Sequence, residues 1–101
     1  MPKHSLIAKL TCTEGRGDEF ETELATLIEA SNEEAGLEIY SAHRDADNVY
    51  WFFELYTDDD AVAAHGKGDA MRAAMAATGG FLAGPPEIHR LTPVVAKGLD
   101  I

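Results

Sequence analysis

The stretch Val49-Tyr-Trp-Phe-Phe-Glu-Leu-Tyr56 decides the fold class of this chain. Its eight residues predict a β-strand, because aromatic and β-branched side chains favour a pleated backbone. A strand with helices on one face normally alternates apolar and polar residues, but here both faces are apolar apart from Glu54. We expect one set of side chains to pack beneath helices: Val49, Trp51, Phe53 and Leu55. The other set then needs a second subunit or a ligand to cover it: Tyr50, Phe52 and Tyr56.

The elements around this strand follow from periodicity and turn residues. We expect a strand over 4–12, an amphipathic helix over 18–35, a strand over 37–44, a helix over 58–79 broken at Gly66 and Gly68, and a strand over 87–95. This β-α-β-β-α-β order predicts an α+β, ferredoxin-like fold with an antiparallel sheet. Residues 1–101 form one domain with a core over about 4–96, and we expect the tail beyond it to be loose. Two such sheets packed face to face would cover the face that has no helices.

Composition excludes several classes of function. The chain has 101 residues, 46% hydrophobic and 26% charged, with a formal net charge of −10. Nucleic acid and anionic membrane surfaces both require a basic footprint, so neither is an expected partner. No stretch predicts a signal peptide or a membrane span, and we expect a cytoplasmic protein. Cys12, the one cysteine, is predicted to be a small core residue, and no Cys/His spacing indicates a metal site.

Several motifs together resemble one known family, the antibiotic biosynthesis monooxygenase (ABM) domain. They follow in the order and spacing of that family: Glu34-Ala-Gly-Leu-Glu-Ile-Tyr40, His43-Arg-Asp45, Phe53-Glu-Leu-Tyr56, Asp60-Ala61, Ala64-His65, and Gly84-Pro-Pro-Glu-Ile88 with Leu91-Thr-Pro-Val94. The similarity covers nearly the whole chain. It implies a dimeric α/β barrel, with a homodimer formed through the open sheet face and a separate cavity in each subunit.

Two residues are candidates for chemistry. His65 is either a general base facing the cavity or a structural histidine bonded to a backbone carbonyl or to Glu54. Glu54, surrounded by aromatic residues, needs a partner or takes up a proton. His65 is its nearest candidate partner in sequence, and Lys9 and Arg44 are alternatives. The Glu54 pairing is either a structural buried pair or part of a catalytic site.

Aromatic side chains form a second group of candidates. Four of them can form a wall for a flat substrate, or the core of a dimer interface: Tyr40, Tyr50, Phe52 and Tyr56. Tyr40 and His43 lie on opposite faces of a regular strand, so they cannot both face one cavity. Trp51 is expected in the core under the helices.

The resemblance implies an enzyme as the first functional hypothesis. This is a cofactor-independent monooxygenase that oxidises a small aromatic molecule, such as a quinol or a polyketide-type phenol. The deprotonated substrate would itself pass an electron to oxygen, so the protein supplies a base, an apolar cavity and hydrogen bonds. No flavin or nicotinamide fingerprint is present, and no cofactor is expected. The alternative is a non-catalytic, small-molecule-binding or stress-related dimer with the same cavity. Haem degradation is set aside, because no histidine lies between His65 and His89.

Overall fold

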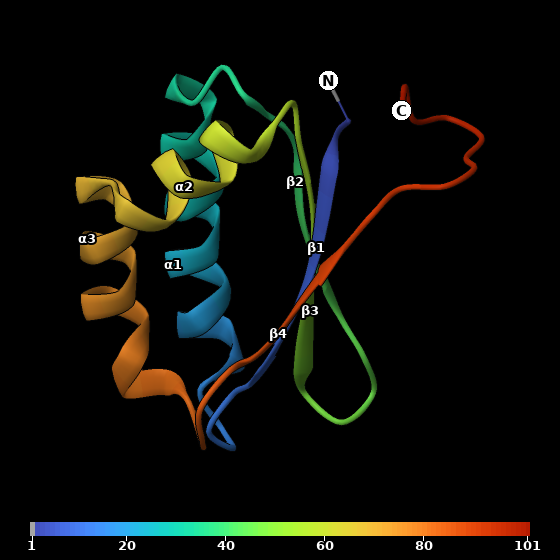
Figure 1. The fold of residues 1–101 in the computed structure, drawn as a ribbon. Helices are drawn as coiled ribbons and strands as arrows, with labels where there is room; N and C mark the ends of the chain where they lie inside the picture. The colour runs from blue at the N-terminus through green and yellow to red at the C-terminus, as the bar shows by residue number, and fades with distance from the viewer. Residues whose placement is uncertain (1) are drawn as a thin grey trace.

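The computed structural model, which describes residues 2–101, has four antiparallel strands and helices packed on one side of the sheet (Figure 1). The elements in chain order are β1 (His4–Thr11), α1 (Gly17–Ala30), the 3₁₀ helix η1 (Ser31–Glu33), β2 (Leu37–Arg44), β3 (Val49–Tyr56), α2 (Asp59–Lys67), α3 (Asp69–Thr78), the 3₁₀ helix η2 (Gly79–Phe81) and β4 (Glu87–Leu91). The strand order is β2-β3-β1-β4. The α+β, ferredoxin-like prediction is therefore confirmed.

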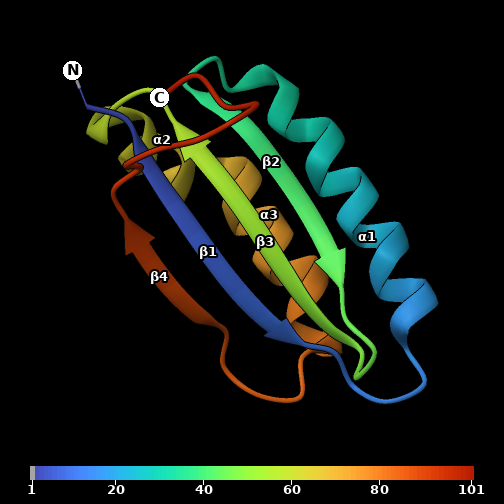
Figure 2. The ribbon, with the colours of Figure 1, turned by 90° about the vertical axis from the view of Figure 1, so that its right-hand side faces the viewer.

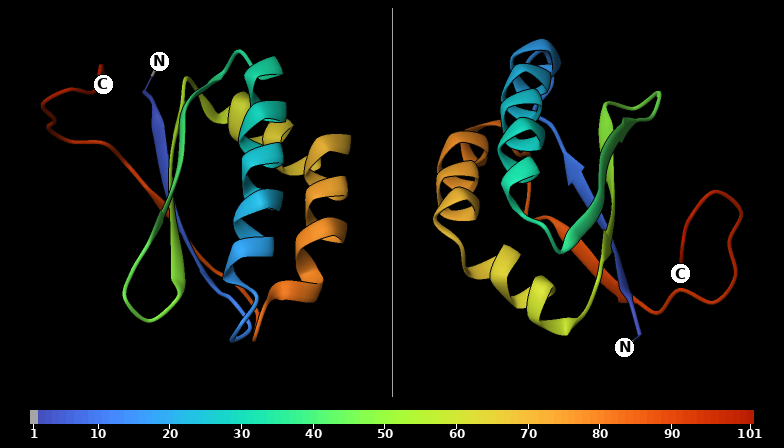
Figure 3. Two further views of the ribbon diagram at one scale, coloured as in Figure 1. Left: turned by 180° about the vertical axis from the view of Figure 1, so that it is seen from behind. Right: turned by 90° about the horizontal axis from the view of Figure 1, so that it is seen from above.

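The two faces of the sheet are covered differently. The helices pack against one face, and the C-terminal tail runs along the other (Figures 1 and 3). Figure 2 looks onto this second face and shows the tail crossing the start of β1 and the end of β3. Lys3, just before β1, donates a hydrogen bond to the main-chain oxygen of Asp100. Apart from this tail, no other part of the described residues 2–101 covers the second face (Figure 2). We call it the open face.

The prediction of which β3 side chains face the helices was wrong. Tyr50, Phe52, Glu54 and Tyr56 lie on the helix side and are buried, with exposed fractions of 5% or less. Tyr50 packs edge-on against Phe20 of α1, with 4.9 Å between ring centroids. Trp51 lies on the open face and is 38% exposed. The physical reason is the register, because Trp51 pairs with Lys9 and His43, whose polar side chains share its face.

The core lies between the helix side of the sheet and α1. Its buried members are Ala8, Cys12, Phe20, Leu24, Tyr50 and Phe52. The expectation that Cys12 is a small core residue is confirmed. Large aromatic rings contribute most of the apolar area buried here, so this side of the sheet supplies the main hydrophobic stabilisation.

Two boundary predictions were also wrong. α1 ends at Ala30 rather than near residue 35, and the Ser31 hydroxyl donates a 2.6 Å hydrogen bond to the Ile28 carbonyl as the chain enters η1. β4 ends at Leu91 rather than at residue 95, two residues before Pro93, which has no N–H for a ladder hydrogen bond. Met75 of α3 is 64% exposed.

Candidate functional site

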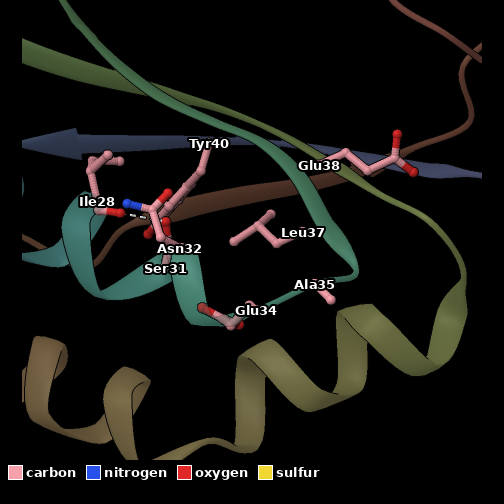
Figure 4. Close-up of a pocket in the computed structure, with 8 residues that line it drawn as sticks. All are labelled: Ile28, Ser31, Asn32, Glu34, Ala35, Leu37, Glu38 and Tyr40. Carbon is pink, nitrogen blue, oxygen red and sulfur yellow. Dashed lines mark hydrogen bonds between the residues drawn. The ribbon is translucent and has the colours of Figure 1, made fainter.

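A pocket of about 540 Å³ lies where α1, η1 and the start of β2 meet (Figure 4). It is open to solvent on one side. Its lining mixes apolar, hydroxyl, amide and carboxylate groups: Ile28, Ser31, Asn32, Glu34, Ala35, Leu37, Glu38 and Tyr40. Figure 4 shows the Glu38 side chain pointing away from the others. Glu38 instead accepts hydrogen bonds from Lys3 at 2.8 Å and from Thr57 at 2.7 Å.

A β-bulge in β2 shapes this pocket. The register shifts between Leu37, which pairs with Tyr56, and Ile39, which pairs with Leu55, so Glu38 is the extra residue. In a regular strand Leu37 and Tyr40 would point to opposite faces, because they are three positions apart. The bulge changes the alternation and brings both side chains to the helix side, where both line the pocket.

Behind the pocket wall, His65 lies between two carboxylates. Its Nδ1 lies 2.8 Å from Oε1 of Glu34, and the N–H donates to that carboxylate. Its Nε2 lies 3.7 Å from Oε1 of Glu54. The structure thus brings Glu54 and His65 together, as the sequence predicted. It also adds Glu34, a closer partner that the sequence reasoning missed.

Two tyrosines complete the surroundings of His65. The Tyr56 hydroxyl donates to Oε1 of Glu54. The ring of Tyr40 lies edge-on to the imidazole, with centroids 5.3 Å apart, and that of Tyr56 lies 5.7 Å away. The imidazole is therefore held by contacts from β2, from β3 and from the segment before β2. We refer to these five residues as the His65 cluster: Glu34, Tyr40, Glu54, Tyr56 and His65.

Burial dominates the electrostatics of this cluster. It raises the pKa of Glu54 above the ordinary carboxyl value, and the hydrogen bond from Tyr56 opposes this by favouring the charged form. Burial and the adjacent Glu54 also raise the pKa of Tyr56, so its hydroxyl stays protonated and can donate. The pKa of Tyr40 is raised by burial for the same reason. The cluster can therefore hold a proton in the interior of the protein.

Two local features hold α2, and with it His65, in place. The Asp58 side chain caps the helix by accepting a 2.9 Å hydrogen bond from the Ala61 N–H. Gly36, just before β2, lies so close to α2 that a Cβ built there would be 2.5 Å from the Cβ of Ala61. The absence of a side chain at Gly36 lets the start of α2 approach the start of β2 closely.

The remaining predicted site residues lie apart from the pocket. Tyr50 donates a 2.7 Å hydrogen bond to Glu21 at the other end of α1. Phe52 belongs to the core and packs against Tyr40 of the site, with ring centroids 5.5 Å apart. Lys9 and Arg44, considered as partners of Glu54, pair instead with Glu87 and with Glu21. His43 lies across the sheet from Tyr40, as expected, and contacts Ser41 at 3.0 Å.

The pocket and the His65 cluster share only two residues, Glu34 and Tyr40. His65 itself does not line the pocket. Most of the pocket residues were missed from the sequence, and four of the eight lie in η1 or at the bulge. Two sequence signals indicate this region. Polar residues follow a helix at Ser31-Asn-Glu33, and Glu38 occupies a strand position where an apolar residue is expected. Within residues 2–101, no three His, Cys, Asp or Glu side chains are arranged so that they could hold a metal ion. No helix in the same range has the length and apolar character to span a membrane.

Comparison with known proteins adds independent information. A crystal structure from Caulobacter crescentus, named a "putative antibiotic biosynthesis monooxygenase", is 32% identical, covers 93% of this chain and 92% of its own, and has a TM-score of 0.88. The protein NE2512 of unknown function from Nitrosomonas europaea is 25% identical over 99% and 97% of the two chains, with a TM-score of 0.86. PA3566 from Pseudomonas aeruginosa is 25% identical over 94% and 97%, with a TM-score of 0.82.

No curated protein matches the chain. The family model described as antibiotic biosynthesis monooxygenase matches residues 4–77, which span β1 to α3 and include every residue of the pocket and of the His65 cluster. The chain therefore belongs to the antibiotic biosynthesis monooxygenase family.

Proposed function

We propose that this protein is a cofactor-independent monooxygenase that oxidises a small phenol or quinol in the pocket beside Glu34 and Tyr40. One observation carries the proposal: the buried imidazole of His65 is hydrogen-bonded through Nδ1 to the carboxylate of Glu34, and Glu34 lines the pocket. A hydroxyl group bound at Glu34 would face a carboxylate that can accept its proton, and His65 holds that carboxylate from behind the pocket wall.

Deprotonation would prepare the substrate for oxygen. The phenolate passes one electron to dioxygen, and the two radicals combine to form a C–O bond at a ring carbon. The resulting peroxide takes up a proton, and its O–O bond breaks as that ring carbon loses its hydrogen as a proton. One oxygen atom stays on the ring as a quinone carbonyl, and the other leaves as water. The protein has to stabilise the anion, hold the ring and limit access of water. Tyr40, Leu37 and Ile28 supply the apolar side of the pocket for the ring. Glu54 and Tyr56 act behind His65, and we assign them to positioning the imidazole.

Oxygen consumption tests the enzyme proposal. The wild-type protein is incubated with a panel of quinols and phenols, and oxygen uptake is compared with that of His65→Gln. General-base catalysis typically contributes 10²- to 10⁴-fold to a rate, so a change that disturbs the Glu34–His65 pair should lower the rate by up to that amount. His43→Gln, a histidine change on the open face, is the matched control and should keep the wild-type rate. Absence of uptake by the wild type across the panel refutes the proposal.

A non-catalytic binding protein is the second candidate, and one observation favours it. Among the buried side-chain nitrogen and oxygen atoms of the described residues, none lacks a hydrogen-bond partner. The His65 cluster is thus a satisfied network that can serve packing alone. Tight binding of an aromatic molecule without oxygen uptake would support this candidate.

We also propose a homodimer formed through the open face. Trp51 and Leu91 are exposed there, and Ile7 and Phe53 are only partly covered. Aromatic residues at the centre of an apolar patch are typical of interfaces between subunits. We expect the wild type to have twice the chain mass of 10.9 kDa in solution. Phe53→Lys should give a monomer, while Met75→Lys, a change of an exposed residue on α3, should not. A monomeric wild type would refute the proposal.

A further inference from the structure

We infer that the pocket selects an uncharged or cationic ligand that donates a hydrogen bond to Oε2 of Glu34, and that it rejects carboxylates and phosphates. The inference rests on the pocket of the proposed function, but it concerns recognition and holds whether or not oxidation follows. Hydroxyl and amino groups share the required chemistry, since both are hydrogen-bond donors.

The first support is the way Glu34 is held. Oε1 is fixed by His65 at 2.8 Å, while 27% of the side chain remains exposed. Within residues 2–101 no hydrogen bond engages Oε2 of Glu34. Because the imidazole holds one oxygen, the carboxylate cannot turn freely. The second oxygen is therefore a pre-oriented acceptor on a side chain that lines the pocket, which lowers the entropy cost of binding a donor.

The second support is the charge of the lining. The eight lining residues include two glutamates and neither lysine nor arginine. Lys3 compensates Glu38 from outside the pocket, and the hydrogen bonds from Lys3 and Thr57 hold the pKa of Glu38 below its ordinary value. Among residues 2–101, no lysine or arginine pairs with Glu34 in this way. A ligand that places a negative charge within about 6 Å of the Glu34 carboxylate would bind roughly tenfold more weakly than the same ligand without that charge, at a dielectric constant between those of water and protein.

The third support is the shape of the remaining lining. Ile28, Ala35, Leu37 and the ring of Tyr40 provide apolar surface beside Glu34. A flat ring can lie against this surface while its donor reaches the carboxylate, because aromatic faces favour such contacts. The ligand class is therefore a small aromatic molecule with a hydroxyl or amino group and no negative charge.

Equilibrium binding tests the inference without any reaction. Calorimetric titrations of the wild-type protein, under nitrogen, compare two matched series of probes. In the first, hydroquinone should bind about tenfold or more tightly than 1,4-dimethoxybenzene, which has the same ring without donors. In the second, affinity should fall in the order 4-hydroxybenzylamine, 4-hydroxybenzyl alcohol, 4-hydroxybenzoate.

Variants assign the selectivity to Glu34. Glu34→Gln keeps the size of the side chain and removes its charge, so the preference for the alcohol over the benzoate should fall from roughly tenfold to about equal. Glu33→Gln, a change of an exposed neighbour that does not line the pocket, should keep the wild-type preference. If Glu34→Gln does not fold, the wild-type series still decides, because it uses no variant.

Three results would overturn the inference. They are a wild type that prefers 4-hydroxybenzoate, a Glu34→Gln variant that keeps the wild-type selectivity, and a wild type that binds none of the probes. Selective binding without oxygen uptake would instead refute the proposed monooxygenase and leave the inference standing. Oxygen uptake without the predicted selectivity would support the monooxygenase and refute the inference about ligand selectivity. The two experiments therefore distinguish failure of one claim from failure of the other.

Discussion

Replacing Glu54 by glutamine is expected to stabilise the protein relative to the wild type, by an amount that grows as the pH rises. Glu54 is 5% exposed, and burial raises its pKa above the ordinary carboxyl value of 4.5. In the folded state this carboxyl binds its proton more tightly than in the unfolded chain. Its contribution to stability is therefore fully present below pH 4.5 and is lost as the pH rises through the raised pKa.

The size of the effect is bounded by proton linkage. Between the unfolded and the folded pKa of Glu54, each pH unit removes at most about 1.4 kcal/mol from the free energy of unfolding. Glutamine avoids this loss because it does not ionise, and its side-chain oxygen can still accept the hydrogen bond from Tyr56. Attraction between the Glu54 carboxylate and His65, 3.7 Å away, acts in the opposite direction. Burial is the larger influence on the Glu54 pKa, so we expect it to prevail.

Urea unfolding from about pH 4 to about pH 8 measures the difference in free energy between wild type and Glu54→Gln. Glu38→Gln is a control of opposite sign. Hydrogen bonds from Lys3 and Thr57 lower the pKa of Glu38, so its contribution is present above the ordinary pKa and is lost as the pH falls. Relative to wild type, Glu38→Gln should therefore lose stability as the pH rises. A Glu54→Gln difference that is flat with pH, or that shrinks as the pH rises, would refute the reasoning.

Three further changes test packing, each by urea unfolding. Gly36→Ala should cost about 1–3 kcal/mol, because the new Cβ meets Ala61, whereas Gly66→Ala meets no atom within 4 Å and should be neutral or stabilising. Asp58→Ala removes the cap of α2 and should cost about 1 kcal/mol, more than Asp60→Ala in the first turn. Phe20→Ala should cost about 3–5 kcal/mol, whereas Met75→Ala at an exposed site should change stability by less than about 0.5 kcal/mol. Equal costs within any pair would contradict the packing described above.

The order of elements could be predicted because each has a local cause. The turn at Asp45–Asn48, the cap at Asp58 and the apolar alternation of β1 each depend on residues close together in the chain. The face of β3 could not be predicted from β3 alone, because its two faces are equally apolar. Lys9 and His43, which flank Trp51 on the neighbouring strands, carry the missing information. That information becomes available only once the register is known.

The candidate site was predictable to a smaller extent. The Glu54–His65 pairing followed from one physical demand, that a carboxylate buried among aromatic rings needs a partner. Glu34 was missed because its contact with His65 joins residues 31 positions apart and depends on how α2 lies over the start of β2. The bulge at Glu38 also escaped prediction. The bulge turns the Leu37 side chain to the helix side of the sheet, whereas in a regular strand it would lie on the opposite face from Tyr40. Leu37 lines the pocket because of this shift.

From the sequence, ligand binding and dimerisation were expected on the same face of β3, whereas the structure puts the side chains for these two roles on opposite faces. Glu54 and Tyr56 point to the helices and the His65 cluster, while Trp51 and Phe53 point to the open face. Ligand binding and the proposed dimerisation would then use opposite sides of one strand. Phe53→Lys should therefore abolish the dimer and keep the preference for 4-hydroxybenzyl alcohol over 4-hydroxybenzoate. Loss of that preference in a folded monomer would mean that the partner subunit completes the pocket, and the separation argued from β3 would be wrong.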